Sequence, residues 1–303
     1  MDAAVTKHLG KDIKEKTRLT GGYTFETWML VLSDNTKVVF RTRDDFVTGG
    51  SREIIIADVL ERERFFHSGV NKELGRVCPE VYVVDGSREY YDKPYCIMEY
   101  IEGAPLSSCY DSFDGRTQCE ISFKIGELAA RIGALEIENT HPYVGDRGSW
   151  EEYISQRLRE RLTPLLKNGV ITQGEIDEIT SGMRRQKAAK TNSFLHLDMR
   201  RVNMIYNGGA IFLVDAENCE FGDPLYELAV IDVGGELGAA VTEGYGSVCG
   251  YVPNLSGGLY RYYFMERHAL VLDVFMNIVR SDWKATEIYL RRFCEARDKL
   301  IGG

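Results

Sequence analysis

The sequence predicts an α+β protein in which a small, strand-rich N-terminal part precedes a larger, mainly helical C-terminal part. The chain has 303 residues, enough for roughly two domains or one large two-lobed unit. The first hundred residues alternate apolar runs with turn residues, which indicates strands with one helix among them. Beyond Gly103 and Pro105 the apolar spacing becomes helical, so we expect an N-terminal lobe at 1–102 and a C-terminal lobe at 103–303.

The N-terminal part begins with a predicted hairpin. Gly21–Gly22 breaks the chain, and residues 24–32 are rich in β-branched and aromatic side chains. Turn residues then lead into a second strand at 37–42. Residues 51–66 predict a helix, because their apolar side chains fall on roughly one face. Two further strands are expected, at 81–84 and 95–98.

The C-terminal part contains several predicted helices. Apolar residues recur at helical spacing over 119–135 and 150–166. Thr172 and Glu175 have the spacing of a capping box, which predicts the start of a third helix. The chain from Pro224 to the end is mostly helical in pattern, with a glycine-rich break expected over 234–258.

The charge excludes some classes of partner. Lys and Arg number 37 and Asp and Glu number 46, so the net charge is -9. Phosphate backbones and anionic membranes both attract positive faces, so we expect no nucleic-acid partner and no membrane partner. A cationic small molecule is compatible with this charge.

The segments needed for secretion or membrane insertion are not recognisable in the sequence. The first residues lack the apolar core of a secretory leader, and no run of about 18 apolar residues occurs. The seven cysteines form no C-x-x-C pair, so we expect free thiols rather than a disulfide framework or a zinc site. These features favour a cytoplasmic protein.

Residues 193–215 carry the clearest chemical pattern. Asn207–Gly208 stands between two short apolar runs, which strongly indicates a hairpin. Antiparallel pairing would bring Asn203 beside Asp215, and Asp198 lies on the loop that leads into the hairpin. Carboxylate and amide oxygens suit Mg²⁺. Phosphoryl transfer needs such a metal, together with a carboxylate that positions the nucleophile.

The pattern His196-x-Asp198-x-x-x-x-Asn203, followed by Asp215, resembles the catalytic core of the protein-kinase-like fold. Its details are similar to the aminoglycoside phosphotransferase and choline kinase-like family, in its antibiotic phosphotransferase branch. The order and spacing of that family are kept in Leu213-Val214-Asp215-Ala216-Glu217 and in Phe221-Gly222-Asp223-Pro224. The resemblance covers about residues 18–235 and implies a two-lobed protein-kinase-like fold.

This resemblance implies roles for the residues of the motif. Asp198 would be the catalytic carboxylate that orients the substrate hydroxyl, and Asn203 and Asp215 would hold magnesium. His196 would brace the loop, and Asp223 would support the same loop through backbone hydrogen bonds.

Two positions depart from the family pattern. Leu197 replaces the usual small residue after the histidine, which we expect to alter the packing of the loop. Arg200 lies two residues after Asp198, where protein kinases keep a lysine that meets the γ-phosphate. Arg200 is therefore a second candidate catalytic residue.

The resemblance also assigns nucleotide-binding residues in the N-terminal part. Arg41, with Arg43 as second choice, would meet the α- and β-phosphates, and either Glu53 or Glu61 would be its helical partner. Gly22 would belong to a turn that covers the phosphates. The hinge residues Met98, Glu99 and Ile101 would contact the purine, and backbone contacts do not separate ATP from GTP.

The implied function is transfer of the γ-phosphoryl group of ATP or GTP, with Mg²⁺, to a hydroxyl of a cationic antibiotic such as an aminoglycoside or a basic peptide, conferring resistance. A metabolic kinase for an amino alcohol, amino acid or sugar is the alternative within kinases. A non-catalytic nucleotide-binding module is the alternative outside them. Asp232, Glu236 and Glu243 lie where this family often places substrate contacts, although a solvated charge is the plainer interpretation of each.

Overall fold

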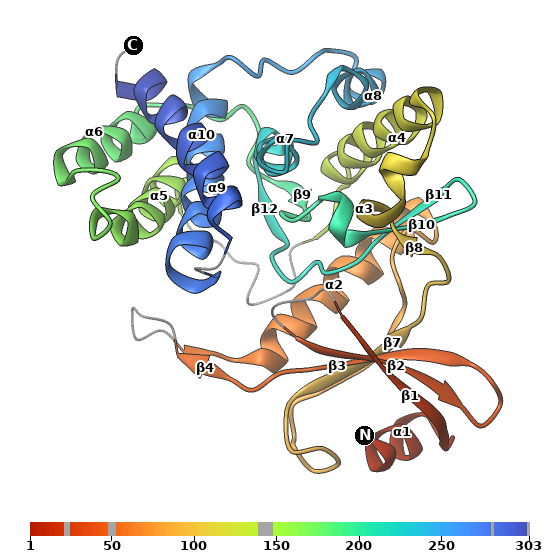
Figure 1. Cartoon of the computed structure of the whole chain (residues 1–303). Coiled ribbons are helices and arrows are strands. Elements are labelled where there is room, and N and C mark those ends of the chain that lie inside the picture. Colours follow the sequence, from red (N-terminus) through yellow and green to blue (C-terminus); the bar gives the residue numbers. More distant parts are fainter. Residues whose placement is uncertain (21–24, 48–52, 139–147, 280–281, 302–303) are drawn as a thin grey trace. The chain divides into compact units, whose positions relative to one another are not determined.

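The computed structural model describes residues 1–20, 25–47, 53–138, 148–279 and 282–301. The chain divides into two units, each with its own internal contacts. Unit 1 comprises Met1–Asp114, Ile137–Val144 and Arg201–Cys219, and unit 2 comprises Gly115–Glu136, Gly145–Arg200 and Glu220–Gly303. Unit 1 holds the main antiparallel sheet and unit 2 holds most of the helices, so the predicted α+β class is confirmed (Figure 1).

A five-stranded antiparallel sheet forms the centre of unit 1. Its strand order is β1-β2-β3-β7-β6. The strands span β1 (Ile13–Leu19), β2 (Glu26–Leu32), β3 (Lys37–Thr42), β6 (Val81–Asp85) and β7 (Tyr95–Glu99). The predicted hairpin at 24–42 is β2 and β3, and the two later strands are β6 and β7. β4 (Phe46–Val47) and β5 (Glu53–Ile54) form a short pair, and β5 occupies part of the first turn of the predicted helix, so α2 (Ile56–Leu74) begins later than expected. It also ends later than expected.

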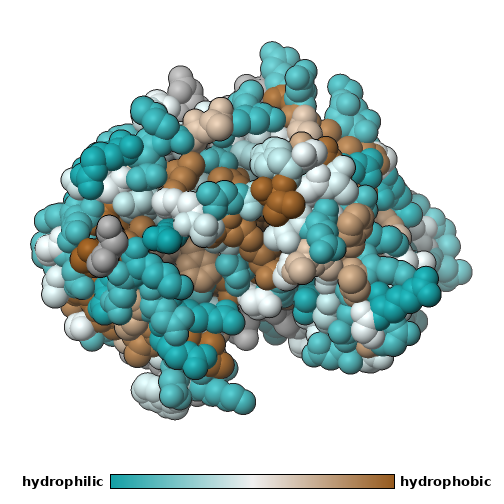
Figure 2. Space-filling view, turned by 90° about the horizontal axis from the view of Figure 1, so that it is seen from above, coloured by the Kyte–Doolittle hydropathy of each residue, from teal (hydrophilic) through white to brown (hydrophobic). Residues whose placement is uncertain are grey.

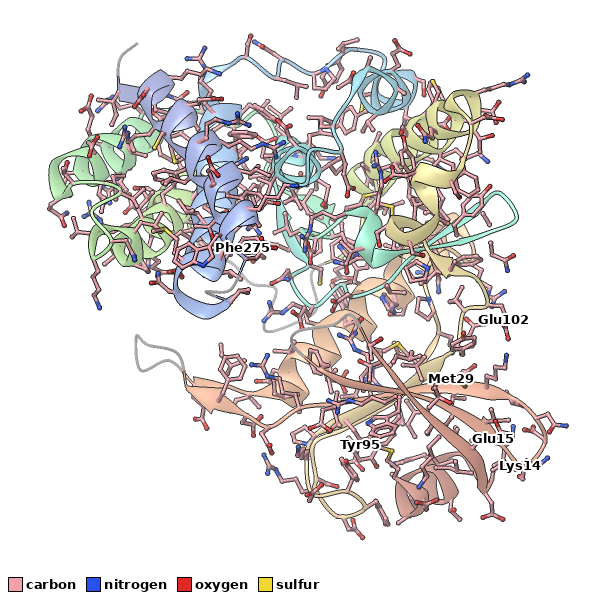
Figure 3. All side chains as sticks on the ribbon, in the orientation of Figure 1. Lys14, Glu15, Met29, Tyr95, Glu102 and Phe275 are labelled. Carbon is pink, nitrogen blue, oxygen red and sulfur yellow. The ribbon has the colours of Figure 1, made fainter. Side chains whose placement is uncertain are left out.

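The two faces of this sheet are buried by different helices. Side chains alternate along a strand, so Phe40 and Tyr95 pack with α1 (Asp2–Leu9) on one face. Cys96 and Met98 pack with α2 on the other face. The helices lie on opposite sides of the sheet in Figure 1, and Tyr95 is labelled in Figure 3. The prediction of a single helix in this region was incomplete, because α1 is short and only its small side chains Ala4 and Val5 are fully buried.

A second, three-stranded sheet in unit 1 has the order β11-β10-β8. The predicted Asn207–Gly208 hairpin is confirmed as β10 (Met204–Asn207) and β11 (Ala210–Leu213). The remaining short elements of unit 1 are β8 (Ala104–Pro105), α3 (Leu106–Cys109), η1 (Tyr110–Ser112) and η2 (Arg201–Asn203).

Unit 2 is built from helices around one short strand pair. The strands β9 (Ser193–Leu195) and β12 (Glu220–Gly222) are antiparallel. The predicted capping box is confirmed, since Thr172 and Glu175 exchange both of its hydrogen bonds at the start of α6. The helices are α4 (Gly115–Gly133), α5 (Trp150–Leu166), α6 (Gln173–Arg184), α7 (Pro224–Val233), α8 (Ala239–Cys249), α9 (Gly258–Asp273) and α10 (Trp283–Ile301), with a π-helical segment η3 (Val274–Val279) after α9.

The expected glycine-rich break over 234–258 is wrong in part, because it contains helix α8. A Cβ atom added at Gly126 of α4 would lie 1.9 Å from the carbonyl oxygen of Val241 in α8. A Cβ added at Gly244 of α8 would lie 2.0 Å from the carbonyl oxygen of Phe123. These glycines therefore let the two helix backbones cross in close contact, which outweighs the low helix propensity of glycine.

The hydrophilic surface and the free thiols are the ones expected from the amino-acid composition and the cysteine spacing. Hydrophilic residues cover much of the face shown in Figure 2, with smaller hydrophobic patches between them. All seven cysteines are free thiols, as expected. Among the helices of the described residues, none combines the length and the apolar character needed to cross a bilayer.

Candidate functional site

Unit 1 contains a cleft of about 450 Å³ that is lined mainly by its five-stranded and three-stranded sheets and by the residues next to their strands. Leu19 and Val39 contribute apolar side chains from the five-stranded sheet, and Phe25 lies just before β2. Ile205 of β10 and Val214, just after β11, contribute the facing apolar side chains. The chain after β7 forms one edge, and the lining includes Arg41, Asn203 and Asp215 among other polar residues. A slot with two apolar walls, a backbone edge and a charged group fits a flat ring that carries an anionic chain.

Arg41 links two carboxylates within this cleft. Its Nη1 donates to both oxygens of Glu63 at 2.6 and 2.7 Å, and its Nη2 donates to Asp215 Oδ1 at 2.8 Å. The guanidinium also lies 4.5 Å from the centre of the Phe25 ring. Burial opposes the charge of Arg41, but Glu63 and Asp215 raise its pKa above the ordinary value. Arg41 therefore stays cationic where an anion would enter.

The helical partner of Arg41 is Glu63, so the assignment of Glu53 or Glu61 was wrong. Glu53 is exposed in β5, ahead of the helix. Glu61 lies on α2 two residues before Glu63, so its side chain is rotated by about 200° around the helix from that of Glu63. It therefore points away from Arg41 and forms an ion pair with Arg64 at 2.7 Å. Glu63 is buried on the face of α2 that meets the sheet, and its Oε1 also accepts the Asp215 N–H at 3.1 Å.

The other N-terminal candidates differ in position. Gly22 lies outside the described residues. Met98 and Ile101 are buried and line the cleft together with Glu99. The side chain of Glu99 bonds Arg76, and its backbone N–H donates to the carbonyl of Glu80 at 2.8 Å.

Hairpin pairing puts Asn203 and Asp215 at the same end of β10–β11. Met204 pairs with Leu213, and the N–H of Val214 donates to the Asn203 carbonyl at 3.0 Å. Asn203 is buried, whereas the Asp215 side chain is 31% exposed toward the cleft. Asp215 has a φ of 65°, a conformation that Asp tolerates better than most residues.

These two side chains present an amide and a carboxylate oxygen on one cleft wall. Mg²⁺ is usually held by one or two protein oxygens together with substrate phosphates and water. The donor set of Asn203 and Asp215 fits this requirement. In the described part of the chain, no group of three or more His, Cys, Asp or Glu side chains is arranged to hold a metal ion.

In unit 2, a short loop after β9 carries Asp198. His196 is fully buried, and its Nδ1 accepts the backbone N–H of Asp198 at 3.2 Å. Glu227 of α7 accepts the N–H groups of His196 and Leu197 at 2.6 and 3.0 Å. Burial raises the pKa of Glu227, although these N–H groups favour its charged form. The loop is therefore fixed by a buried carboxylate that the sequence interpretation missed.

Asp223, which we expected to support this loop, instead caps α7. Its side chain accepts the N–H of Leu225 at 2.9 Å and the hydroxyl of Tyr263 at 3.0 Å. Pro224 at the next position is typical of a helix start. The capping function could have been predicted from the Asp-Pro pair before an apolar run.

Leu197 has a backbone conformation that glycine adopts more easily than leucine. Its φ is 59°, in the left-handed region that glycine adopts without strain. Its side chain is nevertheless buried. The loop therefore packs around a buried leucine side chain at a position where the backbone is left-handed.

Arg200 contacts the candidate catalytic carboxylate directly. Its Nε donates to Asp198 Oδ1 at 2.5 Å, and the Asp198 side chain is 20% exposed. Burial opposes the charge of Arg200, but the hydrogen bond and charge of Asp198 raise its pKa. The pair offers a cation and an anion at one place, which suits the positioning of a hydroxyl near a phosphate.

The sequence model of the phosphotransferase enzyme family (APH) matches residues 16–248. No curated protein matches the sequence.

Solved structures resemble the chain at low sequence identity. A thermostable mutant of aminoglycoside phosphotransferase APH(4)-Ia, solved as a ternary complex with AMP-PNP and hygromycin B, has a TM-score of 0.70 at 17% identity, covering 100% of this chain and 99% of that one. APH(2")-IIia in complex with GDP and kanamycin has a TM-score of 0.67 at 12% identity, covering 97% and 96%. A choline/ethanolamine kinase family protein from Mesorhizobium loti has a TM-score of 0.62 at 16% identity, covering 95% and 93%. These similarities establish a shared fold.

Proposed function

Because the chain belongs to the phosphotransferase enzyme family, we propose that it is a small-molecule kinase that transfers the γ-phosphoryl group of ATP or GTP to a hydroxyl. The observation that carries this proposal is the Arg41 network in the cleft of unit 1. A buried cation held by Glu63 and Asp215 beside an apolar slot suits a purine nucleoside triphosphate. We place the reaction in the cytoplasm, where nucleoside triphosphates are made.

The nucleotide would lie in that cleft. The apolar side chains would cover the purine, and the backbone at Glu99 and Ile101 would bond its edge. Arg41 would neutralise charge on the α- and β-phosphates. Structural neighbours solved with AMP-PNP and with GDP support a nucleotide donor. Backbone contacts leave both ATP and GTP as donors.

Asn203 and Asp215 would hold Mg²⁺ on the phosphates. When bound, the ion would neutralise the negative charge that develops on the transferred group. Asp215 already interacts with Arg41 through Oδ1, so Arg41 also holds this carboxylate in place. Arg41 bonds the carboxylate of Asp215 and Glu63 bonds its backbone N–H, so both residues would orient Asp215 for metal binding.

Asp198 would accept a hydrogen bond from the acceptor hydroxyl and orient its oxygen for attack on the γ-phosphorus. Arg200 would offer positive charge to the transferred group while remaining bonded to Asp198. His196 and Glu227 act as positioning residues, because they hold the backbone of the loop on which Asp198 lies. Catalysis would be mainly positioning and charge neutralisation.

We propose a cationic antibiotic, an aminoglycoside or a basic peptide, as the acceptor, with resistance as the consequence. The net charge of -9 and the neighbours solved with hygromycin B and kanamycin support this class. A second candidate is a metabolic kinase for an amino alcohol, because a choline/ethanolamine kinase family protein shares the fold over 95% of this chain.

A coupled assay of nucleoside diphosphate release tests the proposal. The protein is given ATP or GTP with Mg²⁺ and a panel of aminoglycosides, basic peptide antibiotics, amino alcohols and sugars. We expect one class to stimulate release and Asp198→Asn to abolish the stimulation. Magnesium-dependent nucleotide binding without turnover on any acceptor would favour the binding-module alternative instead.

A further inference from the structure

Unit 2 contains a cavity of about 400 Å³ whose lining includes none of the residues proposed above to bind the nucleotide, the metal or the acceptor hydroxyl. It is formed by the end of α7, by the segment before α9, and by α9 and α10, which lie side by side in Figure 1. Its lining combines charges of both signs, Asp232, Arg261 and Arg292, with the apolar side chains of Leu255 and Phe264. A mixed lining of this kind is typical of a small-molecule site.

The negative charge of the cavity comes from Asp232. The hydroxyl of Tyr260 donates to Asp232 Oδ2 at 2.6 Å and fixes the carboxylate. Burial raises the pKa of Asp232, and the nearby charge of Arg292 partly offsets this effect. Asp232 is therefore a half-buried carboxylate rather than the solvated charge that the sequence suggested.

The positive charges come from Arg261 and Arg292, which each donate a hydrogen bond to a backbone carbonyl. Arg292 Nη1 donates to the Val233 carbonyl at 3.2 Å, and Arg261 Nη1 donates to the Lys299 carbonyl at 3.3 Å. Within the described ranges, neither guanidinium forms an ion pair with a carboxylate. A backbone carbonyl carries no net charge, so the positive charge of each part-buried guanidinium remains available to an anionic group of a ligand.

The backbone leaves room for the Arg292 side chain. Gly235 has a φ of 72°, and a Cβ added there would lie 3.1 Å from Arg292 Nη2. Asp232 and Arg292 thus line one cavity with opposite charges that do not pair directly. Opposite charges on one cavity lining suit a ligand that carries both an ammonium and a carboxylate group.

We propose that this cavity binds a small zwitterion, of which an amino acid is the simplest, with its carboxylate on Arg292 and Arg261 and its ammonium on Asp232. Phe264 and Leu255 would contact the apolar part of the ligand. A polyphosphate is a poorer fit, because Asp232 would repel it. Exposed Glu295 and Lys299, at the edge of the cavity, carry opposite charges and leave this balance unchanged.

Thermal-shift titrations of the full chain without nucleotide, with the common L-amino acids as probes, test the proposal. At least one amino acid should raise Tm saturably. Its N-acetyl and amide derivatives, which each lack one charge, should not. Because no nucleotide is present, failure here leaves the proposed phosphotransfer untouched.

Two variants and one matched control identify the site. Arg292→Gln and Asp232→Asn should each weaken binding roughly ten- to a hundredfold. Arg291→Gln, at the exposed neighbouring position of α10, should bind as the wild type does. If Arg292→Gln does not fold, Arg261→Gln gives the same test. The proposal is overturned if no amino acid raises Tm, if the singly charged derivatives bind equally well, or if the variants that fold bind unchanged.

Discussion

Replacing Glu63 by glutamine removes the charge that faces Arg41 without changing the shape of the side chain. The Glu63 side chain is 1% exposed and Arg41 is 9% exposed, so their ion pair is shielded from water. Breaking a buried pair by neutralising one partner costs about 3–5 kcal/mol. Arg41 keeps Asp215 as a counter-charge, so the low end of this range, about 3 kcal/mol, applies.

Glu61→Gln is the matched control on the same helix. Glu61 pairs with Arg64 three residues away, and their side chains are 33% and 45% exposed. Such a surface pair contributes below about 1 kcal/mol. The two variants differ by two positions in the sequence and should differ by about 2 kcal/mol or more in the free energy of unfolding.

Urea unfolding followed by tryptophan fluorescence and circular dichroism measures this difference. With a slope of about 2–3 kcal/mol/M, the Glu63→Gln midpoint should lie roughly 1 M below that of Glu61→Gln. Affinity for ATP should fall in Glu63→Gln only, because Arg41 loses its orientation. Equal midpoints and equal affinities would refute the account of the Arg41 network.

Three further predictions concern pH, backbone strain and metal. Burial opposes the charge of Glu266, but Arg267, Arg157 and Arg161 hold its pKa at about 2 rather than 4.5. The charged Glu266 therefore stabilises the folded state above pH 4.5, and this contribution is lost as the pH falls toward 2. At pH 7, Glu266→Gln should have a free energy of unfolding about 3 kcal/mol below that of the wild type. This difference should shrink as the pH falls from 4.5 toward 2. A deficit that does not change with pH would contradict this assignment. Leu197 combines a φ of 59° with burial, so Leu197→Gly should be more stable than Leu197→Ala by about 1 kcal/mol in chemical denaturation, the reverse of the usual order. Asp215→Asn should lower the affinity for ATP at least about tenfold in magnesium and by much less in EDTA, as measured by calorimetry; equal losses in both conditions would argue against a metal-binding role.

Local patterns predicted most of the elements that position the site. Asn207–Gly208 predicted the β10–β11 hairpin, and the capping box at Thr172 predicted the start of α6. Both signals operate over a few residues, so the sequence contains all the information they need. The pairing of Asn203 with the end of β11 followed from the same hairpin.

Contacts between residues far apart in the chain could not be predicted from the sequence. Which glutamate of α2 meets Arg41 depends on the rotation of the helix against the sheet, and the short β4–β5 pair shifts the start of that helix. Helix α8 was obscured because its glycines serve a contact with α4, far away in the sequence. Glu227 was missed because its partners are backbone groups 30 and 31 residues earlier in the chain.

Mass spectrometry of the acceptor tests the central claim most directly. The protein is incubated with ATP or GTP, Mg²⁺ and the compound that best stimulates diphosphate release. The account predicts that the compound gains the mass of one phosphoryl group with the wild-type protein and stays unmodified with Asp198→Asn. An acceptor that remains unmodified while nucleotide is consumed, or one that is modified equally by Asp198→Asn, would contradict the proposed kinase.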